Sequence, residues 1–127
     1  MNVLDENIIA SQRDRLRQWR IPFRQIGHEL PGRGAQDAQI IPLLLELKQP
    51  TFFTRDFDFF KPQLWHERYC LVWLNVRPDR AAFFIRRFLR HPAFSTRQER
   101  LGKVIRVHAD GLEYCNRVQP SPVALGW

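Results

Sequence analysis

Five acidic side chains occur at three separate points of an otherwise basic chain. They are Asp5 and Glu6, then Asp37, then Asp56 and Asp58. The whole sequence holds 13 acidic residues against 20 Lys plus Arg. Carboxylates that converge repel one another unless positive charge lies between them, and Mg²⁺ and Mn²⁺ are hard cations that prefer oxygen ligands. A fold that brings these acids together would therefore make a divalent-metal site.

The net charge of the chain indicates what such a site would act on. A formal charge of +7 favours polyanionic partners, meaning nucleic acid or an anionic membrane surface, although a solvated basic surface explains the charge equally well. Divalent ions held by carboxylates stabilise the attacking and leaving oxygens of phosphodiester hydrolysis. Together, the acids and the basic background favour chemistry on nucleic acid.

Each acid also has a simpler explanation. Asp37 could cap the helix that follows it. The acids near the N-terminus could lie in a loop facing the positive end of the first helix. Asp56 and Asp58 could be solvated turn residues paired with Arg55 or Lys61. The sequence leaves these alternatives open.

The hydrophobic pattern predicts the elements that must position the acids, in the order β-α-β-α-β-β-α-β-β. The predicted strands cover residues 2–4, 20–26, 51–54, 68–74, 102–107 and 112–116, and the predicted helices cover residues 8–19, 36–48 and 78–89. This alternation predicts an α/β fold whose central sheet is mostly parallel and flanked by helices, with a C-terminal antiparallel hairpin. We expect one domain over residues 1–118 and a tail, flexible or interface-forming, over residues 119–127.

In open α/β sheets, functional groups gather beyond the carboxyl ends of the strands. Asp5 directly follows the first predicted strand, and Asp56 follows the third. Asp37 begins the second helix on the face that packs against the sheet, although Pro42 is expected to disturb that helix. We therefore expect three segments to deliver carboxylates to one edge of the sheet.

The sequence also bears on the compartment. It begins without the basic and then apolar run of a signal peptide, and no apolar stretch approaches the ~18 residues of a membrane span. Cys70 and Cys115 are far apart and are expected to be reduced core thiols. We expect a cytoplasmic protein that does not enter the membrane.

Three short segments carry a resemblance to a known family. They read Leu4-Asp5-Glu6-Asn7, Gly34-Ala35-Gln36-Asp37 and Thr54-Arg55-Asp56-Phe57-Asp58-Phe59. In order and spacing they resemble the PIN-like domains, specifically the small bacterial group related to VapC-type toxins. The resemblance extends to about Asn116 and includes the predicted strand from Gly102 to Val107.

The resemblance implies a three-layer PIN-like fold and a metal-dependent endoribonuclease, often the toxin of a toxin–antitoxin pair. It implies Mg²⁺ or Mn²⁺ as cofactor, RNA as substrate, an antitoxin as partner, and a homodimer, which is common in the family. The implied catalytic residues, which also bind metal, are Asp5, Asp37, Asp56 and Asp58. Glu6 is a further implied metal ligand, and Thr54 and Asn7 are supporting residues.

Arginines and aromatic residues are the candidates for contact with the nucleic acid. The arginines expected to bind its phosphates are Arg13, Arg17, Arg33, Arg55 and Arg87. Solvated helix faces are the alternative. Phe57, Phe59 and Phe60 could stack on bases beside the acids, but Phe59 is the best candidate for the core.

Two other functions are compatible with the same acids. A receiver-like signalling domain has an acidic pair after its first strand and a phosphate-accepting Asp after its third. It has no role for Asp37, however, and this chain has no Lys at the end of its last predicted parallel strand. The second alternative is a non-catalytic nucleic-acid-binding protein on a PIN-like fold.

Overall fold

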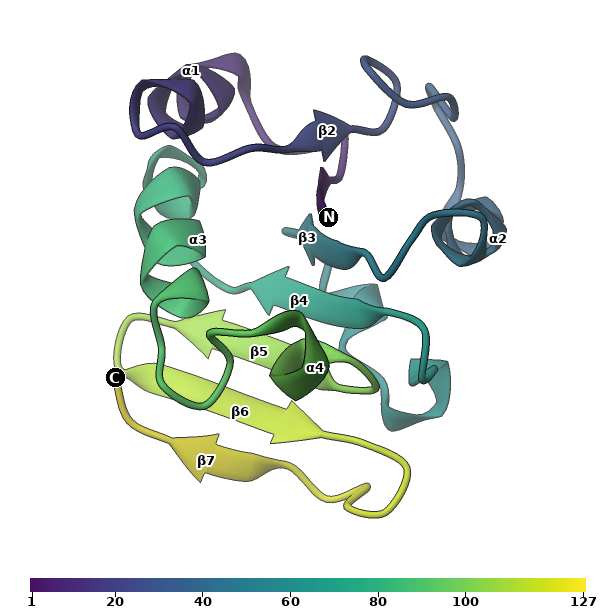
Figure 1. Ribbon diagram of the computed structural model, residues 1–127, viewed down its shortest axis with the longest axis vertical. Coiled ribbons are helices and arrows are strands. Elements are labelled where there is room, and N and C mark those ends of the chain that lie inside the picture. Colours follow the sequence, from purple (N-terminus) through teal and green to yellow (C-terminus); the bar gives the residue numbers. More distant parts are fainter.

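The computed structural model describes all 127 residues and contains one seven-stranded sheet (Figure 1). The order of the strands across the sheet is β2-β1-β3-β4-β5-β6-β7. The strands are β1 (Asn2–Leu4), β2 (Arg24–Gln25), β3 (Thr51–Thr54), β4 (Cys70–Leu74), β5 (Val104–His108), β6 (Gly111–Cys115) and β7 (Val123–Leu125). Strands β1 to β5 are parallel, whereas β6 and β7 are antiparallel to their neighbours. The predicted α/β class, the mostly parallel sheet and the C-terminal hairpin are thereby confirmed.

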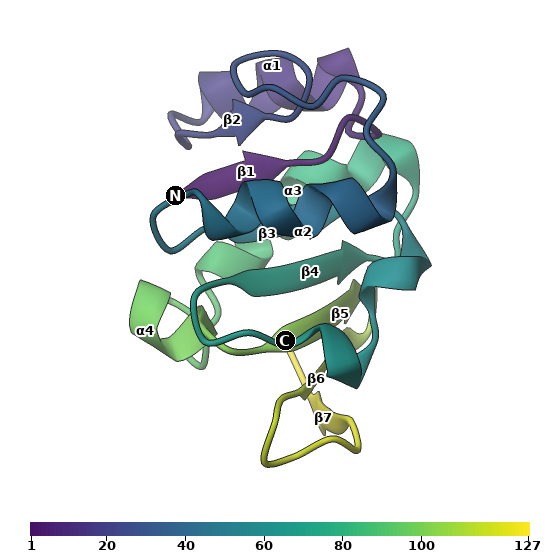
Figure 2. The same ribbon diagram turned by 90° about the vertical axis from the view of Figure 1, so that its right-hand side faces the viewer.

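Helices cover both faces of the sheet. They are α1 (Ala10–Gln18), α2 (Asp37–Leu45), α3 (Ala81–Leu89) and the short α4 (Arg97–Arg100). Helices α1 and α3 lie on one face, and α2 lies on the other (Figures 1 and 2). Two 3₁₀ turns, η1 (Phe57–Phe59) and η2 (Pro62–Leu64), connect β3 to β4, and a third, η3 (Pro78–Arg80), precedes α3. None of the helices is long and apolar enough to cross a membrane.

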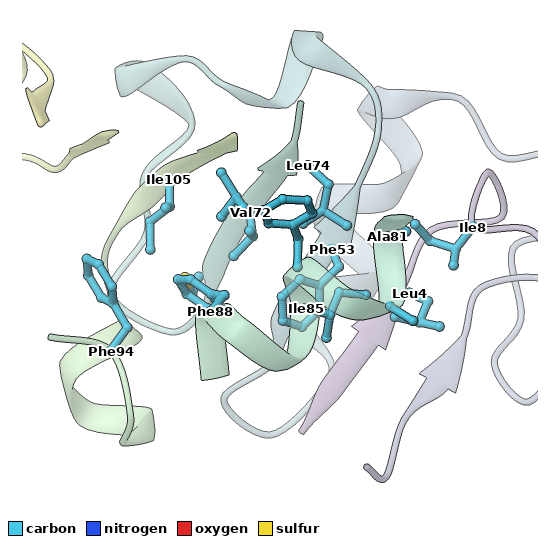
Figure 3. Close-up of a cluster of buried hydrophobic side chains, with 14 of the residues drawn as sticks. Leu4, Ile8, Phe53, Val72, Leu74, Ala81, Ile85, Phe88, Phe94 and Ile105 are labelled. Carbon is cyan, nitrogen blue, oxygen red and sulfur yellow. The ribbon is translucent and has the colours of Figure 1, made fainter. Parts of the chain in front are cut away.

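Two rows of apolar side chains run across the parallel strands, one on each face. Successive residues of a strand point to opposite faces, so neighbouring residues enter different cores. The row Leu4, Phe53, Val72 and Ile105 packs against α1 and α3 (Figure 3). The row Val3, Phe52, Leu71 and Val104 belongs to the second core, which includes Ile40 and Leu44 of α2. This register determines on which side of the sheet each strand end presents its side chains.

Several predicted strands and helices begin or end at residues other than those expected. The second strand is only two residues long, because the segment before Arg24 passes over the edge of the sheet without pairing. The first helix was predicted from residue 8 but begins at Ala10, and the side chain of Ile9 before it is 44% exposed. Helix α2 continues through Pro42, which is exposed, as far as Leu45.

The C-terminal segment, for which the pattern predicted no element, contains a strand. Val123 to Leu125 form β7, which pairs with β6. The indole N–H of Trp127 donates a hydrogen bond to the carbonyl oxygen of His108 at 2.9 Å. The Nε2 atom of His91 lies 2.8 Å from the carbonyl oxygen of Gly126. Residues 123–125 therefore extend the sheet, although the sequence pattern predicted no strand there.

Candidate metal centre

The ends of β1 and β3 bring two site residues side by side. Leu4 pairs with Phe53, so Asp5 and Thr54 come next in the register of the two strands. Alternation along a strand places both on the α2 side of the sheet, in line with the row that contains Val3 and Phe52. The hydroxyl of Thr54 donates a hydrogen bond to Oδ2 of Asp5 at 2.6 Å. The Asp5 carboxylate is therefore held in one orientation at the carboxyl edge of the sheet.

Thr54 also links this carboxylate to the loop that follows β3. Its hydroxyl oxygen accepts a hydrogen bond from the backbone N–H of Asp56 at 3.0 Å and from the Asn7 side-chain amide at 3.4 Å. The Asn7 side-chain oxygen in turn accepts from the backbone N–H of Arg55 at 3.3 Å. Thr54 is fully buried, so these contacts satisfy its hydroxyl completely. The loops after β1 and β3 are thus joined by side chains.

Three carboxylates converge in front of this pair of loops. One oxygen from each of Asp37, Asp56 and Asp58 lies within 4.8 Å of the others. Oδ1 of Asp56 accepts from the backbone N–H of Asp58 at 2.9 Å, which caps the 3₁₀ turn η1 and turns both side chains the same way. Asp37 comes from a different part of the sequence, because it is the first residue of α2.

The structure contradicts the simpler explanation for Asp37. The N-cap of α2 is Gln36, whose backbone N–H donates a hydrogen bond to the side-chain oxygen of Gln39 at 2.8 Å. Asp37 is the first residue inside the helix and caps nothing, so its carboxylate is free to face Asp56. Its negative charge at the positive end of the helix remains favourable.

None of the site acids forms an ion pair within 4.0 Å, although Lys61 lines the same small pocket as Asp37 and Asp58. Every ion pair within 4.0 Å involves other acids, namely Asp14, Glu29, Asp79 and Glu113. Arg55, the nearest arginine in sequence, donates instead to the carbonyl oxygen of Val76 at 3.2 and 3.3 Å. The expected alternative, that Asp56 and Asp58 are neutralised by Arg55 or Lys61, is therefore wrong.

Burial, together with neighbouring negative charges, raises the pKa of two site carboxyl groups. Burial raises the pKa of Asp5, and the charges of Asp56 and Glu6 raise it further, against the hydrogen bond from Thr54 that lowers it. Burial also raises the pKa of Asp37, with further increases from Asp56, Asp58 and Asp5. Because the pKa of each carboxyl is raised, the ionised forms of Asp5 and Asp37 are less favourable here than in water. A hard divalent cation would relieve this repulsion, and the all-carboxylate donor set fits Mg²⁺ or Mn²⁺.

Glu6, expected as a further metal ligand, is placed differently. Its carboxylate accepts a hydrogen bond from the backbone N–H of Gly34 and lies against Gly27, where any larger residue would collide with it. Glu6 therefore holds the loop between β2 and α2, and neither Glu6 nor Asp5 is one of the three converging carboxylates. The neighbouring Asp5 points the other way because Thr54 binds it.

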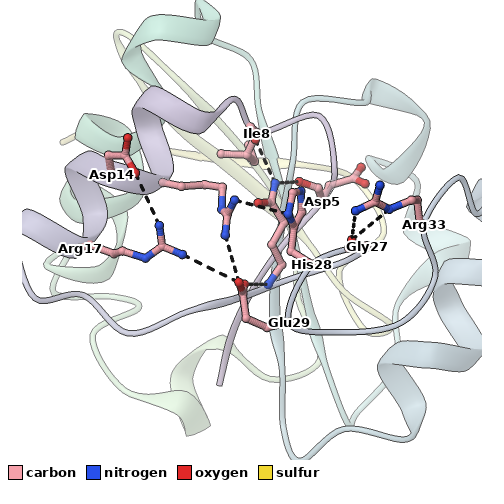
Figure 4. Close-up of polar contacts among 10 residues, drawn as sticks. Asp5, Ile8, Asp14, Arg17, Gly27, His28, Glu29 and Arg33 are labelled. Carbon is pink, nitrogen blue, oxygen red and sulfur yellow. Dashed lines mark hydrogen bonds and ion pairs between the residues drawn. The ribbon is translucent and has the colours of Figure 1, made fainter.

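Four of the five arginines expected to contact nucleic acid make polar contacts within the fold: Arg55 with Val76, and three others around α1 and the loop before α2 (Figure 4). Arg13 pairs with Glu29 at 3.0 Å and its side chain is only 14% exposed. Arg17 contacts the same glutamate at 3.8 Å and Asp14 at 3.5 Å. Arg33 donates to the carbonyl oxygen of Gly27 at 3.1 Å. These contacts fasten α1 and the loop before α2 to the edge of the sheet.

The other predicted contact residues lie in varied settings. Arg87 stacks over the ring of Trp127, with its guanidinium carbon 4.6 Å from the ring centroid. Phe59 is buried in the core, as expected, and Phe60 packs against Trp73. Phe57, between the two acids of η1, is 60% exposed. Its ring packs edge-on against Trp73, with the centroids 5.7 Å apart, and it is the most exposed of the three phenylalanines.

A basic pocket next to the site was not predicted from the sequence. It has a volume of about 660 Å³ and lies beyond the carboxyl ends of β3, β4 and β5. Its lining consists of Arg55, Asn75, Val76, Arg77, Pro78, Arg80, Phe84 and Ala109. Asn75 and Arg77 follow β4 directly, so the strand-end rule that singled out the acids would also have found them.

Comparisons with protein-family models, with curated proteins and with solved structures found no match. A function for this chain therefore has to be inferred from the geometry and charge of the site itself. The PIN-like resemblance of its three acidic segments remains an expectation from the sequence.

The raised pKa values predict how Asp37→Asn changes stability. A carboxyl whose folded-state pKa is raised contributes stability below its unfolded pKa of about 3.9, and this is lost as the pH rises through the raised value. Without metal, we expect Asp37→Asn to increase the free energy of unfolding at pH 7 by no more than about 0.5 kcal/mol, because solvent screens this exposed group. At pH 3 the increase should vanish.

Divalent metal should reverse the sign of this effect. A ligand that binds only the folded state stabilises it by about 2.7 kcal/mol at 100 times its Kd. Mn²⁺ should therefore raise the thermal midpoint of the wild type by several degrees and that of Asp37→Asn by much less. Thermal unfolding followed by circular dichroism, with Mn²⁺ or with EDTA, measures both. An equal rise in the two proteins would show that Asp37 is not a metal ligand.

Proposed function

We propose that this protein is a metal-dependent ribonuclease that uses Asp37, Asp56 and Asp58 with Asp5 as its carboxylates. The observation that carries the proposal is the convergence of Asp37, Asp56 and Asp58, without an ion pair, in a chain of net charge +7. A fold that only needed stability would pair such acids with the abundant arginines. Leaving them unpaired is what a cation site requires.

The chain's own residues supply the remaining functions of such a site. The Thr54 hydroxyl orients the Asp5 carboxylate, and the backbone N–H of Asp58 orients Asp56. Mg²⁺ or Mn²⁺ bound there would supply Lewis-acid activation of water and stabilisation of the charge that develops on the phosphate oxygens. Burial raises the pKa of Asp5, so its carboxylate is a stronger proton acceptor than an ordinary aspartate.

The surroundings of the site favour a polyanionic strand as substrate. Arg55, Arg77 and Arg80 line the pocket beyond the ends of β3 and β4, and a phosphate backbone that crosses the carboxylates would reach it next. Phe57 offers an exposed ring on which an unpaired base would stack. Single-stranded RNA presents both groups, phosphates and unstacked bases, to one surface.

The resemblance of the acidic segments adds the biological setting to this proposal. PIN-like ribonucleases of this size are often toxins held inactive by an antitoxin. We include an antitoxin partner, a homodimeric state and a cytoplasmic location in the proposal on that resemblance. The basic pocket and the exposed Phe57 form the surface that an inhibitory partner would cover.

Incubation with a mixed pool of RNA tests the proposed activity. The purified wild type should cut RNA with Mn²⁺ or Mg²⁺, and excess EDTA should abolish the cleavage. Cleavage that persists in EDTA would overturn the metal–carboxylate mechanism. Absence of cleavage, combined with RNA binding, would favour the non-catalytic nucleic-acid-binding function.

A receiver-like signalling function is a second candidate, because the sheet order favours it. The parallel strands have the order 2-1-3-4-5, which is that of flavodoxin-like folds. Asp5 and Asp56 follow the first and third strands, as a phosphate-accepting site would require. Against it, β5 ends in His108 and Ala109 without a lysine, and Asp37 has no role. Labelling of Asp56 by acetyl phosphate would support this function, and absence of label would exclude it.

A further inference from the structure

A second basic pocket lies at the opposite edge of the sheet from the carboxylates. It has a volume of about 340 Å³ and opens beside the amino ends of β1 and β2. Its lining consists of Met1, Asn2, Pro22, Phe23, Arg24, Arg97 and Arg100. Three of these residues are arginines and none is acidic. The pocket is therefore positively charged and far from the acids at the carboxyl ends of the same parallel strands.

Arg100 is the anchor of this pocket. It is only 8% exposed, yet both of its hydrogen-bond acceptors are neutral. Its Nε donates to the Thr51 hydroxyl at 3.0 Å, and its Nη1 donates to the carbonyl oxygen of Phe94 at 2.9 Å. No carboxylate lies within 4.0 Å of its guanidinium. Buried charges in proteins are normally paired, and the guanidinium of Arg100 has no anionic partner within the chain. An anion bound in the pocket would supply that partner.

Arg24 and Arg97 stand on either side of that anchor. Arg97 begins α4, one turn before Arg100, and Arg24 begins β2. Both are exposed, and neither forms an ion pair or a side-chain hydrogen bond within the chain. Three guanidinium groups of like charge around one pocket repel one another, which an anion between them would reverse.

We propose that this pocket binds the phosphate group of a nucleotide. Guanidinium groups present paired N–H donors that match the oxygens of a phosphate, which makes arginine the preferred residue for this ligand. Arg100, fixed through Thr51 and Phe94, provides a rigid first contact, and Arg24 and Arg97 provide further donors. Pro22 and Phe23 form an apolar wall on which the nucleoside part packs. The phosphate belongs either to a free nucleotide or to an RNA strand, and both present the same chemistry.

Isothermal titration in EDTA tests this site separately from the carboxylates, because no divalent metal is then present to bridge phosphate to them. The ligands are inorganic phosphate, uridine monophosphate and a short single-stranded RNA. The test variant is Arg24→Gln combined with Arg97→Gln. The matched control is Arg90→Gln combined with Arg117→Gln, which removes equal charge from exposed residues outside the pocket.

We expect saturable binding to the wild type that weakens about tenfold or more in the test variant and is unchanged in the control. Binding of the mononucleotide would assign the pocket to a free nucleotide, and binding of RNA alone with the same dependence would assign it to a strand. Equal binding by all three proteins, or no saturable binding of any ligand, would overturn the proposal. Arg100→Gln also removes the contacts to Thr51 and Phe94, so the exposed pair gives the cleaner test. The two proposals are tested independently. An inactive carboxylate site would not contradict phosphate binding in this pocket, and phosphate binding in this pocket would not support the proposed ribonuclease activity.

Discussion

Asp56→Asn should reduce metal-dependent RNA cleavage at least about 100-fold while the protein stays folded. Asparagine has the shape of aspartate, and its side-chain oxygen can still accept the hydrogen bond from the N–H of residue 58, which is 2.9 Å long in the wild type. The substitution removes only the negative charge from the converging group. Each tenfold loss of rate corresponds to about 1.4 kcal/mol, and a cation site that has lost a central carboxylate loses several kcal/mol of transition-state stabilisation.

Initial rates of cleavage of a fluorescent RNA, at saturating Mn²⁺, measure this effect. Asp14→Asn is the matched control, because Asp14 is an exposed acid of α1 that pairs only with Arg17. The control should retain the wild-type rate. Equal rates for Asp56→Asn and the wild type, with both proteins folded by circular dichroism, would remove Asp56 from the proposed site.

Phe53→Ala should lower the free energy of unfolding by about 3–5 kcal/mol. Phe53 is fully buried in β3, between Leu4 and Val72 in the row that faces α1 and α3. Its ring lies edge-on to Phe88 of α3, with the two centroids 5.8 Å apart. Truncation leaves a cavity that a closely packed interior fills only in part. Small domains have total stabilities of about 5–15 kcal/mol, so the loss is a large share.

Urea denaturation gives the size of this loss. Phe53→Leu keeps most of the volume and should cost less than about 1.5 kcal/mol. Phe57→Ala removes the same ring from an exposed position and should cost about 0.5 kcal/mol. Comparable losses for Phe53→Ala and Phe57→Ala would mean that the β3 row does not form the core described here. Because Asp5 and Thr54 follow this row, a destabilised β3 should also weaken metal binding.

Much of the fold was predictable because its cause is local. Alternation of short apolar segments with helical periodicity requires a sheet covered on both faces, and the long crossover connections between successive strands make most of them parallel. The Asp110-Gly111 pair indicates the hairpin between β5 and β6, whose two turn residues are Ala109 and Asp110. The strand β7 was missed, since three residues carry no readable period and the strand is formed only through its pairing with β6. The predicted second strand, residues 20–26, was longer than β2, since the length of an edge strand also depends on how far it pairs with its neighbour.

The candidate site divides in a similar way. The order of residues identifies the acids that can reach the carboxyl edge, because an acid directly after a parallel strand lies at that edge. Their roles follow from the folded structure, since the direction of a side chain beyond a strand end depends on partners distant in sequence. Asp5 is turned by Thr54, and Glu6 by the N–H of Gly34. Contacts of this kind span tens of residues and leave no local pattern, so the sequence contained the candidate ligands but not the selection among them.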